Sequence, residues 1–139
     1  MKKEKPEYWY NQSGVIPYKK EGGELKILLI RSRKGKRWIF PKGIIEPGLS
    51  PEDSAVKEAF EEAGVEGKLV KDYFVKYKYK KWGGICEVKL FLMKVEKIFP
   101  EWPEMFRERN WFYPDQISKV LKKKKMVKII NDLVKFRQQ

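Results

Sequence analysis

The chain has 139 residues, and 32 lysines and arginines against 19 acidic residues give it a formal net charge of +13. A field of this sign favours anionic partners, such as nucleotides, polyphosphates, nucleic acid or acidic lipid heads. There is no histidine, which excludes histidine bases, histidine metal ligands and serine–histidine triads. The length predicts a single domain over 1–139, with a flexible terminus over 1–10.

Cysteine usage and hydropathy predict a cytoplasmic location. Cys86 is the only cysteine, so an internal disulfide is excluded and a reducing compartment is expected. Cys86 lies in an apolar run, which favours packing over a role as nucleophile. No apolar run approaches the roughly 20 residues that span a bilayer, so no membrane partner is expected. The oligomeric state stays open between monomer and homodimer.

The first third of the chain predicts strands and turns. Residues 13–18 and 25–31 read as strands, and the turn at 21–24 joins them as a hairpin. Residues 32–37 form a basic loop with a turn glycine, and a short strand follows at 38–41, where Pro41 ends it.

A helix is predicted from Pro51 to Ala63. Ser50 is suited to the N-cap with Asp53 three residues later, and Pro51 suits the first helical position. Gly64 suits a left-handed C-cap. Small residues recur every fourth position and allow close packing on a sheet: Ala55, Ala59 and Ala63.

The remaining chain returns to strands and ends in helix. Residues 73–80 alternate aromatic or apolar side chains with lysines, and a glycine turn at 82–84 leads into a second strand at 85–96. A last short strand is expected at 110–113, followed by helical sequence over 114–136. Strands before and after one central helix, with helical sequence at the end of the chain, predict an α+β fold with a mixed, layered sheet.

Three glutamates on the central helix carry the chemistry. Glu58, Glu61 and Glu62 are three and four residues apart, so their carboxylates share one helical face. A solvated acidic face is one interpretation, since charged helix faces are ordinarily exposed. The other is a site for Mg²⁺ or Mn²⁺, which prefer carboxylate oxygens.

The surrounding residues resemble a known family. Residues 43–65 are similar to the Nudix box, G-x5-E-x7-R-E-U-x-E-E-x-G-U, in which U is bulky and aliphatic. Gly43, the three glutamates, Gly64 and Val65 fall in register. Three positions depart from the pattern: Leu49 replaces a glutamate, Lys57 replaces an arginine and Ala59 replaces a bulky aliphatic residue.

The resemblance implies a Nudix-type mixed β-sheet sandwiched between helices (α/β/α layers). It also implies a Mg²⁺- or Mn²⁺-dependent pyrophosphohydrolase that cleaves a diphosphate linkage by attack of water on phosphorus. The W-x-x-P-K-G entry at residues 38–43 and the R-x-R-x-W-F at 107–112 are similar to the diadenosine and diphosphoinositol polyphosphate hydrolase branch. A dinucleoside polyphosphate is therefore the first expected substrate.

Site residues follow from the resemblance and from charge. The expected metal ligands are Glu58, Glu61, Glu62 and the Lys42 carbonyl. The expected catalytic residues are Glu62, Glu58 and Lys57, where Lys57 orients a neighbouring carboxylate. Some family members use a distant glutamate as base, and the candidates here are Glu87, Glu101, Glu104 and Glu108. The expected substrate-binding residues are Arg31, Arg33, Arg37, Lys42, Gly43, Arg107 and Arg109.

Several alternatives stay open. The arginines are solubilising charges in an equally favoured interpretation. Trp38, Trp102 and Trp111 are candidates for stacking a base or for packing, and the lysines at 122–125 are expected on a solvated helix face or junction. Two other functions compete: pyrophosphate removal from RNA 5′ ends, and a catalytically weakened nucleotide-binding regulatory module, which Leu49 and Lys57 favour.

Overall fold

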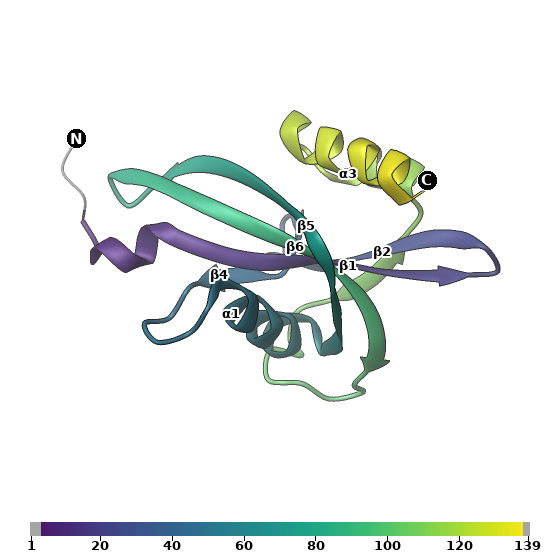
Figure 1. The fold of residues 1–139 in the computed structure, drawn as a ribbon, viewed down its shortest axis with the longest axis horizontal. Coiled ribbons are helices and arrows are strands. Elements are labelled where there is room, and N and C mark those ends of the chain that lie inside the picture. Colours follow the sequence, from purple (N-terminus) through teal and green to yellow (C-terminus); the bar gives the residue numbers. More distant parts are fainter. Residues whose placement is uncertain (1–3, 138–139) are drawn as a thin grey trace.

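A seven-stranded mixed sheet divides the molecule into layers. The computed structural model describes residues 4–137. Helix α1 (Pro51–Glu58) covers one face of the sheet, and α3 (Lys124–Arg137) covers the other (Figure 1). The expected α+β class and the α/β/α layering are therefore confirmed.

The sheet path runs in the order β3-β2-β1-β6-β5, with β4 paired to β1 and β7 paired to β2. The strands are β1 (Asn11–Glu21), β2 (Glu24–Arg31), β3 (Trp38–Ile39), β4 (Lys42–Ile44), β5 (Val65–Lys81), β6 (Gly84–Ile98) and β7 (Arg109–Phe112). β1 and β6 are parallel and the other pairs are antiparallel. Each strand predicted from the sequence is present, and β4 is an additional short strand.

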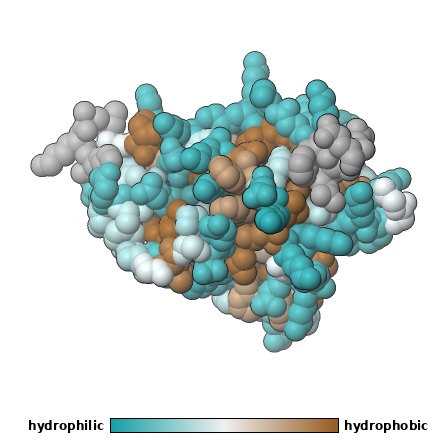
Figure 2. All heavy atoms as spheres, viewed as in Figure 1, coloured by the Kyte–Doolittle hydropathy of each residue, from teal (hydrophilic) through white to brown (hydrophobic). Residues whose placement is uncertain are grey.

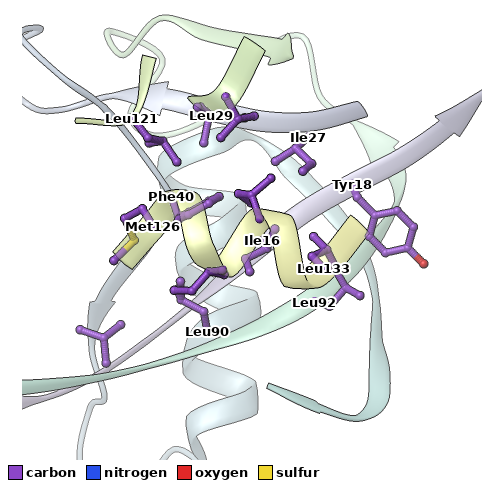
Figure 3. Close-up of a cluster of buried hydrophobic side chains, with 14 residues drawn as sticks. Ile16, Tyr18, Ile27, Leu29, Phe40, Leu90, Leu92, Leu121, Met126 and Leu133 are labelled. Carbon is purple, nitrogen blue, oxygen red and sulfur yellow. The ribbon is translucent and has the colours of Figure 1, made fainter. Parts of the chain in front are cut away.

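The larger hydrophobic cluster lies between the sheet and the C-terminal helices. Figure 3 shows side chains from β1, β2 and β6 meeting residues of α3. The predicted aromatic face of β5 packs against this cluster, through Tyr73, Val75, Tyr77 and Tyr79. Burial of such apolar side chains contributes about 1.5–3 kcal/mol for each large residue, so this cluster anchors the strands of the sheet to the C-terminal helices.

The smaller cluster holds α1 against the opposite face. Ala55, Ala59 and Ala63 are fully buried there, and they pack with the buried side chains of Val15 and Phe91. Their small side chains let the helix backbone approach the sheet closely. Ser50 caps this helix by accepting a hydrogen bond from the Asp53 amide at 3.0 Å.

The predicted helix changes its winding at its second half. α1 continues into a wider π-helical turn, η2 (Ala59–Ala63), and ends at Gly64 with φ of 66°. Such turns often occur at functional sites because they re-aim side chains. Here the turn carries Glu61 and Glu62.

The C-terminal helical sequence is divided in two. α2 (Pro114–Val120) ends before an extended Leu121, and α3 begins at Lys124. The chain turns at residues 121–123, which brings Ile117, Leu121 and Met126 into the same buried cluster. One straight helix would separate these apolar faces. The lysines at 122–123 therefore lie on a junction.

The N-terminal segment is partly structured. Residues 1–3 of the expected flexible terminus lie outside the described residues. Residues Glu7–Tyr10 form the short helix η1, in which Tyr10 is 3% exposed. Trp9 and Trp82 meet edge to face with ring centroids 5.2 Å apart, so this segment packs on the β5–β6 turn.

Candidate active site

Glu58 and Glu62 form a close pair of carboxylates beside β4. A Cβ atom added to Gly43 would lie only 2.4 Å from Glu58 Cδ, so a larger residue there would displace the Glu58 carboxylate. The Lys42 amide donates a hydrogen bond to Glu62 Oε1 at 3.2 Å. β4 therefore borders both carboxylates, through the Gly43 backbone beside Glu58 and the Lys42 amide beside Glu62.

Burial and mutual repulsion raise the pKa of both carboxyl groups. Burial is the main cause for both groups. For Glu62 the charge of Glu58 is the second cause, and the pKa of Glu62 rises to about 8. A side-chain hydrogen bond links the two groups. Each group therefore keeps its proton to a higher pH than an ordinary glutamate, and a nearby cation would favour the ionised forms.

Glu61 points to a different partner. Lys57 Nζ lies 3.2 Å from Glu61 Oε1 and 2.9 Å from Glu46 Oε1. Hydrogen bonds to Glu46 and then to Glu61 raise the pKa of Lys57. Lys57 thus contacts a neighbouring carboxylate, as its sequence position predicts, and it bridges two.

The donor set suits a hard divalent cation. Over residues 4–137, no three acidic or cysteine side chains converge as a ready-made metal cluster. The Glu58–Glu62 pair nonetheless supplies two adjacent carboxylates, and their raised pKa values are the repulsion that Mg²⁺ or Mn²⁺ relieves. Glu61 joins them only if it leaves Lys57, so the expected ligand set stays a prediction.

A pocket of about 410 Å³ opens beside this pair. Glu62 is the one acidic residue among the described residues that line it. The basic residues that line it are Arg33, Arg37, Lys42, Lys81, Arg107, Lys122 and Lys123. A cavity with this charge suits a polyanion, because each cation offers a charge-assisted hydrogen bond to a phosphate oxygen.

Lys42 is held inside the pocket by a polar network. Its Nζ donates to Gln12 Oε1 at 2.9 Å and to the Tyr79 hydroxyl at 3.1 Å. The Tyr79 hydroxyl also donates to Gln12 Oε1 at 2.9 Å. Burial, and then the charge of Lys81, lower the pKa of Lys42 to about 8. An incoming anion would stabilise its charged form.

The predicted arginines fall into two groups. Arg33, Arg37 and Arg107 line the pocket. Arg31 instead stacks on Trp38, with Cζ 4.1 Å from the ring centroid. Arg109 donates to the carbonyls of Ala63, Gly64 and Phe99 at 2.7–3.3 Å. Arg31 and Arg109 are therefore outside the set of residues that line the pocket, although Trp38, on which Arg31 stacks, belongs to it.

The loop before β7 closes the end of the glutamate-bearing turn. The Trp102 indole donates to the Glu62 carbonyl at 3.1 Å, and the Glu104 amide donates to the Glu61 carbonyl at 2.9 Å. Arg109 stacks on Trp102 with Cζ 3.8 Å from the ring centroid. Carbonyls that a helix end leaves without partners are satisfied here by side chains and amides of a distant loop.

Some site residues were not predicted from the sequence. The pocket is also lined by Tyr77, Tyr79, Lys81, Lys122 and Lys123. Alternation along residues 73–80 assigns the tyrosines to the inner face, but it does not show that two of them border a cavity. Lys122 and Lys123 enter the pocket through the turn at 121–123, for which the sequence carries no strong breaker, and Lys81 enters it from the end of β5. Cys86 is fully buried, which confirms packing over exposure.

The comparisons identify relatives. Residues 11–133 match the family model described as NUDIX domain. The chain is 40% identical to Nudix hydrolase 21, chloroplastic, of Arabidopsis thaliana over 70% of this chain and 52% of the relative. It is 31% identical to diphosphoinositol polyphosphate phosphohydrolase 3-alpha of Mus musculus, over 84% of this chain and 71% of the relative.

A solved structure supports the fold. The Ap4A hydrolase binary complex of C. elegans superposes with a TM-score of 0.77 at 22% identity, covering 92% of this chain and 97% of that one. The chain spans 52% and 56% of the lengths of the two plant relatives it matches first. Over residues 4–137, no helix has both the length and the apolar character needed to cross a bilayer.

Proposed function

The chain belongs to the Nudix hydrolase family, and from this premise we propose that it is a Mg²⁺-dependent pyrophosphohydrolase that cleaves a diphosphate linkage. Mn²⁺ is the alternative cation, and the first substrate to test is a dinucleoside polyphosphate. One observation carries the proposal: Glu62, a member of a close carboxylate pair, lines a pocket whose other charged described residues are all basic.

The reaction consumes one water. Its oxygen bonds to phosphorus, the bridging phosphorus–oxygen bond breaks, and the bridging oxygen leaves with one phosphate product. When bound, a divalent cation supplies charge neutralisation and a lower pKa of the attacking water. Glu58, Glu61, Glu62 and the Lys42 carbonyl are the groups to hold it. The water proton passes to the Glu58–Glu62 pair, which titrates as a unit.

The pocket cations position the phosphates. Arg33, Arg37 and Arg107 offer guanidinium groups, and Lys42 offers an ammonium whose position Gln12 and Tyr79 fix. Of the four distant candidate bases, Glu104 has a charge that raises the pKa of both Glu58 and Glu62. Glu104 is therefore the first of the four to test as a base.

The test is product analysis with Mg²⁺ and a substrate panel. The panel contains dinucleoside polyphosphates, an inositol pyrophosphate, ADP-ribose, nucleoside triphosphates and triphosphorylated RNA. Glu62→Gln should lose at least about a hundredfold in kcat, the usual contribution of general acid–base groups. Glu96→Gln, at an exposed carboxylate paired with Lys68 at 3.9 Å, is the matched control and should keep wild-type kcat.

Two outcomes would redirect the proposal. Tight nucleotide binding with no turnover of any panel member would favour the regulatory module. An unchanged kcat in Glu62→Gln would contradict the proposed role of Glu62 in the reaction.

Pyrophosphate removal from RNA 5′ ends is the second candidate, and Lys122 and Lys123 at the pocket border favour it. Its affinity would fall steeply with salt, because many phosphates are neutralised, whereas a small nucleotide gives a shallower slope. A cytoplasmic, reducing location also remains a proposal, supported by one buried free cysteine.

A further inference from the structure

An exposed aromatic ring stands beside the basic pocket. Phe106 is 60% exposed and its neighbour Met105 is 54% exposed, although most of the surface seen in Figure 2 is hydrophilic. Two guanidinium groups lie near the Phe106 ring, with Cζ of Arg33 at 5.6 Å and Cζ of Arg107 at 5.7 Å from its centroid. Both arginines line the pocket, so Phe106 lies at its border.

The loop that carries Phe106 is anchored on both sides. The Glu104 amide donates a hydrogen bond to the Glu61 carbonyl on the glutamate-bearing turn at 2.9 Å. At the other end of the loop, the Arg31 amide of β2 donates a hydrogen bond to the Glu108 carbonyl at 2.9 Å. Arg107 is 7% exposed and donates to the Arg31 carbonyl at 3.0 Å. The ring is therefore presented from a fixed support.

Several other aromatic side chains near the site are only partly exposed, and each of these has a cation closer to its ring than the two arginines are to Phe106. Arg31 covers Trp38, and Arg109 covers Trp102 at 3.8 Å. Lys19 covers Trp111 at 4.4 Å. Inside the pocket, Lys42 and Lys123 lie 4.8 Å and 5.6 Å from the Tyr79 ring centroid. The cations inside the pocket are suited to bind phosphates. Phe106 is the exposed ring at the pocket's border.

We propose that Phe106 is the stacking platform for a nucleobase of the substrate, while the pocket cations hold the phosphates. The inference rests on the proposed function and names its substrate class, a nucleoside polyphosphate. A flat base gains stacking energy on a phenylalanine ring, and Arg33 beside it offers a second planar surface. A base-free polyanion would bind the same cations without contacting Phe106.

Binding separates these two classes of ligand. In a Glu62→Gln background, which prevents turnover, calorimetry would compare ADP with inorganic pyrophosphate in the presence of Mg²⁺. Phe106→Ala should weaken ADP binding about tenfold, within the range that one stacked base contributes, and should leave pyrophosphate binding unchanged. Phe106→Tyr should restore ADP binding.

The matched control is Phe74→Ala. Phe74 is 45% exposed and has Lys89 Nζ 4.2 Å from its ring centroid, but it lies on the β5–β6 hairpin outside the residues that line the pocket. It should leave both affinities at the wild-type value. Equal weakening of ADP and pyrophosphate by Phe106→Ala, or no change in either, would overturn the platform. Absence of turnover across the substrate panel would instead overturn the proposed function, and the affinity comparison would stand.

Discussion

Lys57 and Glu46 form an ion pair, with Nζ and Oε1 2.9 Å apart. Lys57 also contacts Glu61 at 3.2 Å. In the Nudix pattern a glutamate stands where this chain has Leu49, and an arginine stands where it has Lys57. Glu46, three positions earlier, supplies a carboxylate to the cation at position 57. We therefore propose that Glu46 partly compensates for the two departures from the pattern.

Glu46→Gln should lower kcat by up to about fivefold, because Lys57 loses the partner that fixes its position beside Glu61. An exposed ion pair contributes about 1 kcal/mol or less to stability, and the two side chains are 41% and 50% exposed, so Tm should not change. Steady-state kinetics and thermal unfolding check both. Glu21→Gln, which breaks an exposed pair with Lys26 on the β1–β2 turn, should leave kcat unchanged. Wild-type kcat in Glu46→Gln would contradict the compensation.

Arg109→Ala should destabilise the fold by about 3 kcal/mol, because three carbonyls lose a charged donor. Trp102, which holds the Glu62 carbonyl, would also lose the guanidinium stacked on its ring. The glutamate-bearing turn would then be less well fixed, so kcat should fall together with stability. Urea unfolding measures the first effect. Arg33→Ala removes an arginine whose side chain is 71% exposed and should leave the unfolding midpoint unchanged. Equal midpoints for Arg109→Ala and wild type would show that these bonds contribute little.

Most of the fold could be predicted because its signals are local. Ser50, Pro51 and Gly64 mark the ends of one helix, and alternation along β5 assigns each side chain to a face. Glu58 and Glu62 could be paired from spacing alone, since residues four apart share a helical face.

Long-range contacts could not be predicted in the same way. Arg109 contacts the glutamate-bearing turn across a gap of some 45 residues. The R-x-R pattern at 107–109 therefore does not show whether an arginine binds helix carbonyls or substrate phosphates. Lys123 enters the pocket because the helical sequence is interrupted at Leu121. Burial of Leu121 stabilises this interruption, and no proline or glycine marks it in the sequence. Glu61 was grouped with its neighbours, and only the structure shows that Lys57 engages it.

In the metal-free protein, stability should fall as pH rises from about 5 to about 8. The pKa of Glu62 is raised from 4.5 to about 8 when the protein folds. Between these values the folded state keeps a proton that the unfolded state has released, so stability decreases with pH. Lys42, whose pKa is lowered from 10.5 to about 8, acts in the opposite direction, but only above this window.

Urea unfolding in EDTA at both pH values measures this effect. Glu62→Gln should flatten the dependence, whereas Glu96→Gln should retain it. Added Mg²⁺ should raise the midpoint at pH 8 more than at pH 5. A wild-type midpoint that is constant or rises over the window would show that Glu62 is ionised in the fold without help from a cation.

Lys123→Ala should raise the KM for a polyphosphate substrate by roughly tenfold, the scale of one hydrogen bond to a charged group. Lys123 lines the pocket, and burial followed by repulsion from Arg37 lowers its pKa. A bound phosphate would relieve that repulsion, so the energy of the contact is available to the substrate. Lys128→Ala, on the following helix α3, is the control, because Lys128 is 78% exposed and pairs with Asp132 at 3.3 Å. Its KM should match the wild type. If Lys123→Ala and Lys128→Ala give the same KM, the junction between α2 and α3 takes no part in holding the phosphates.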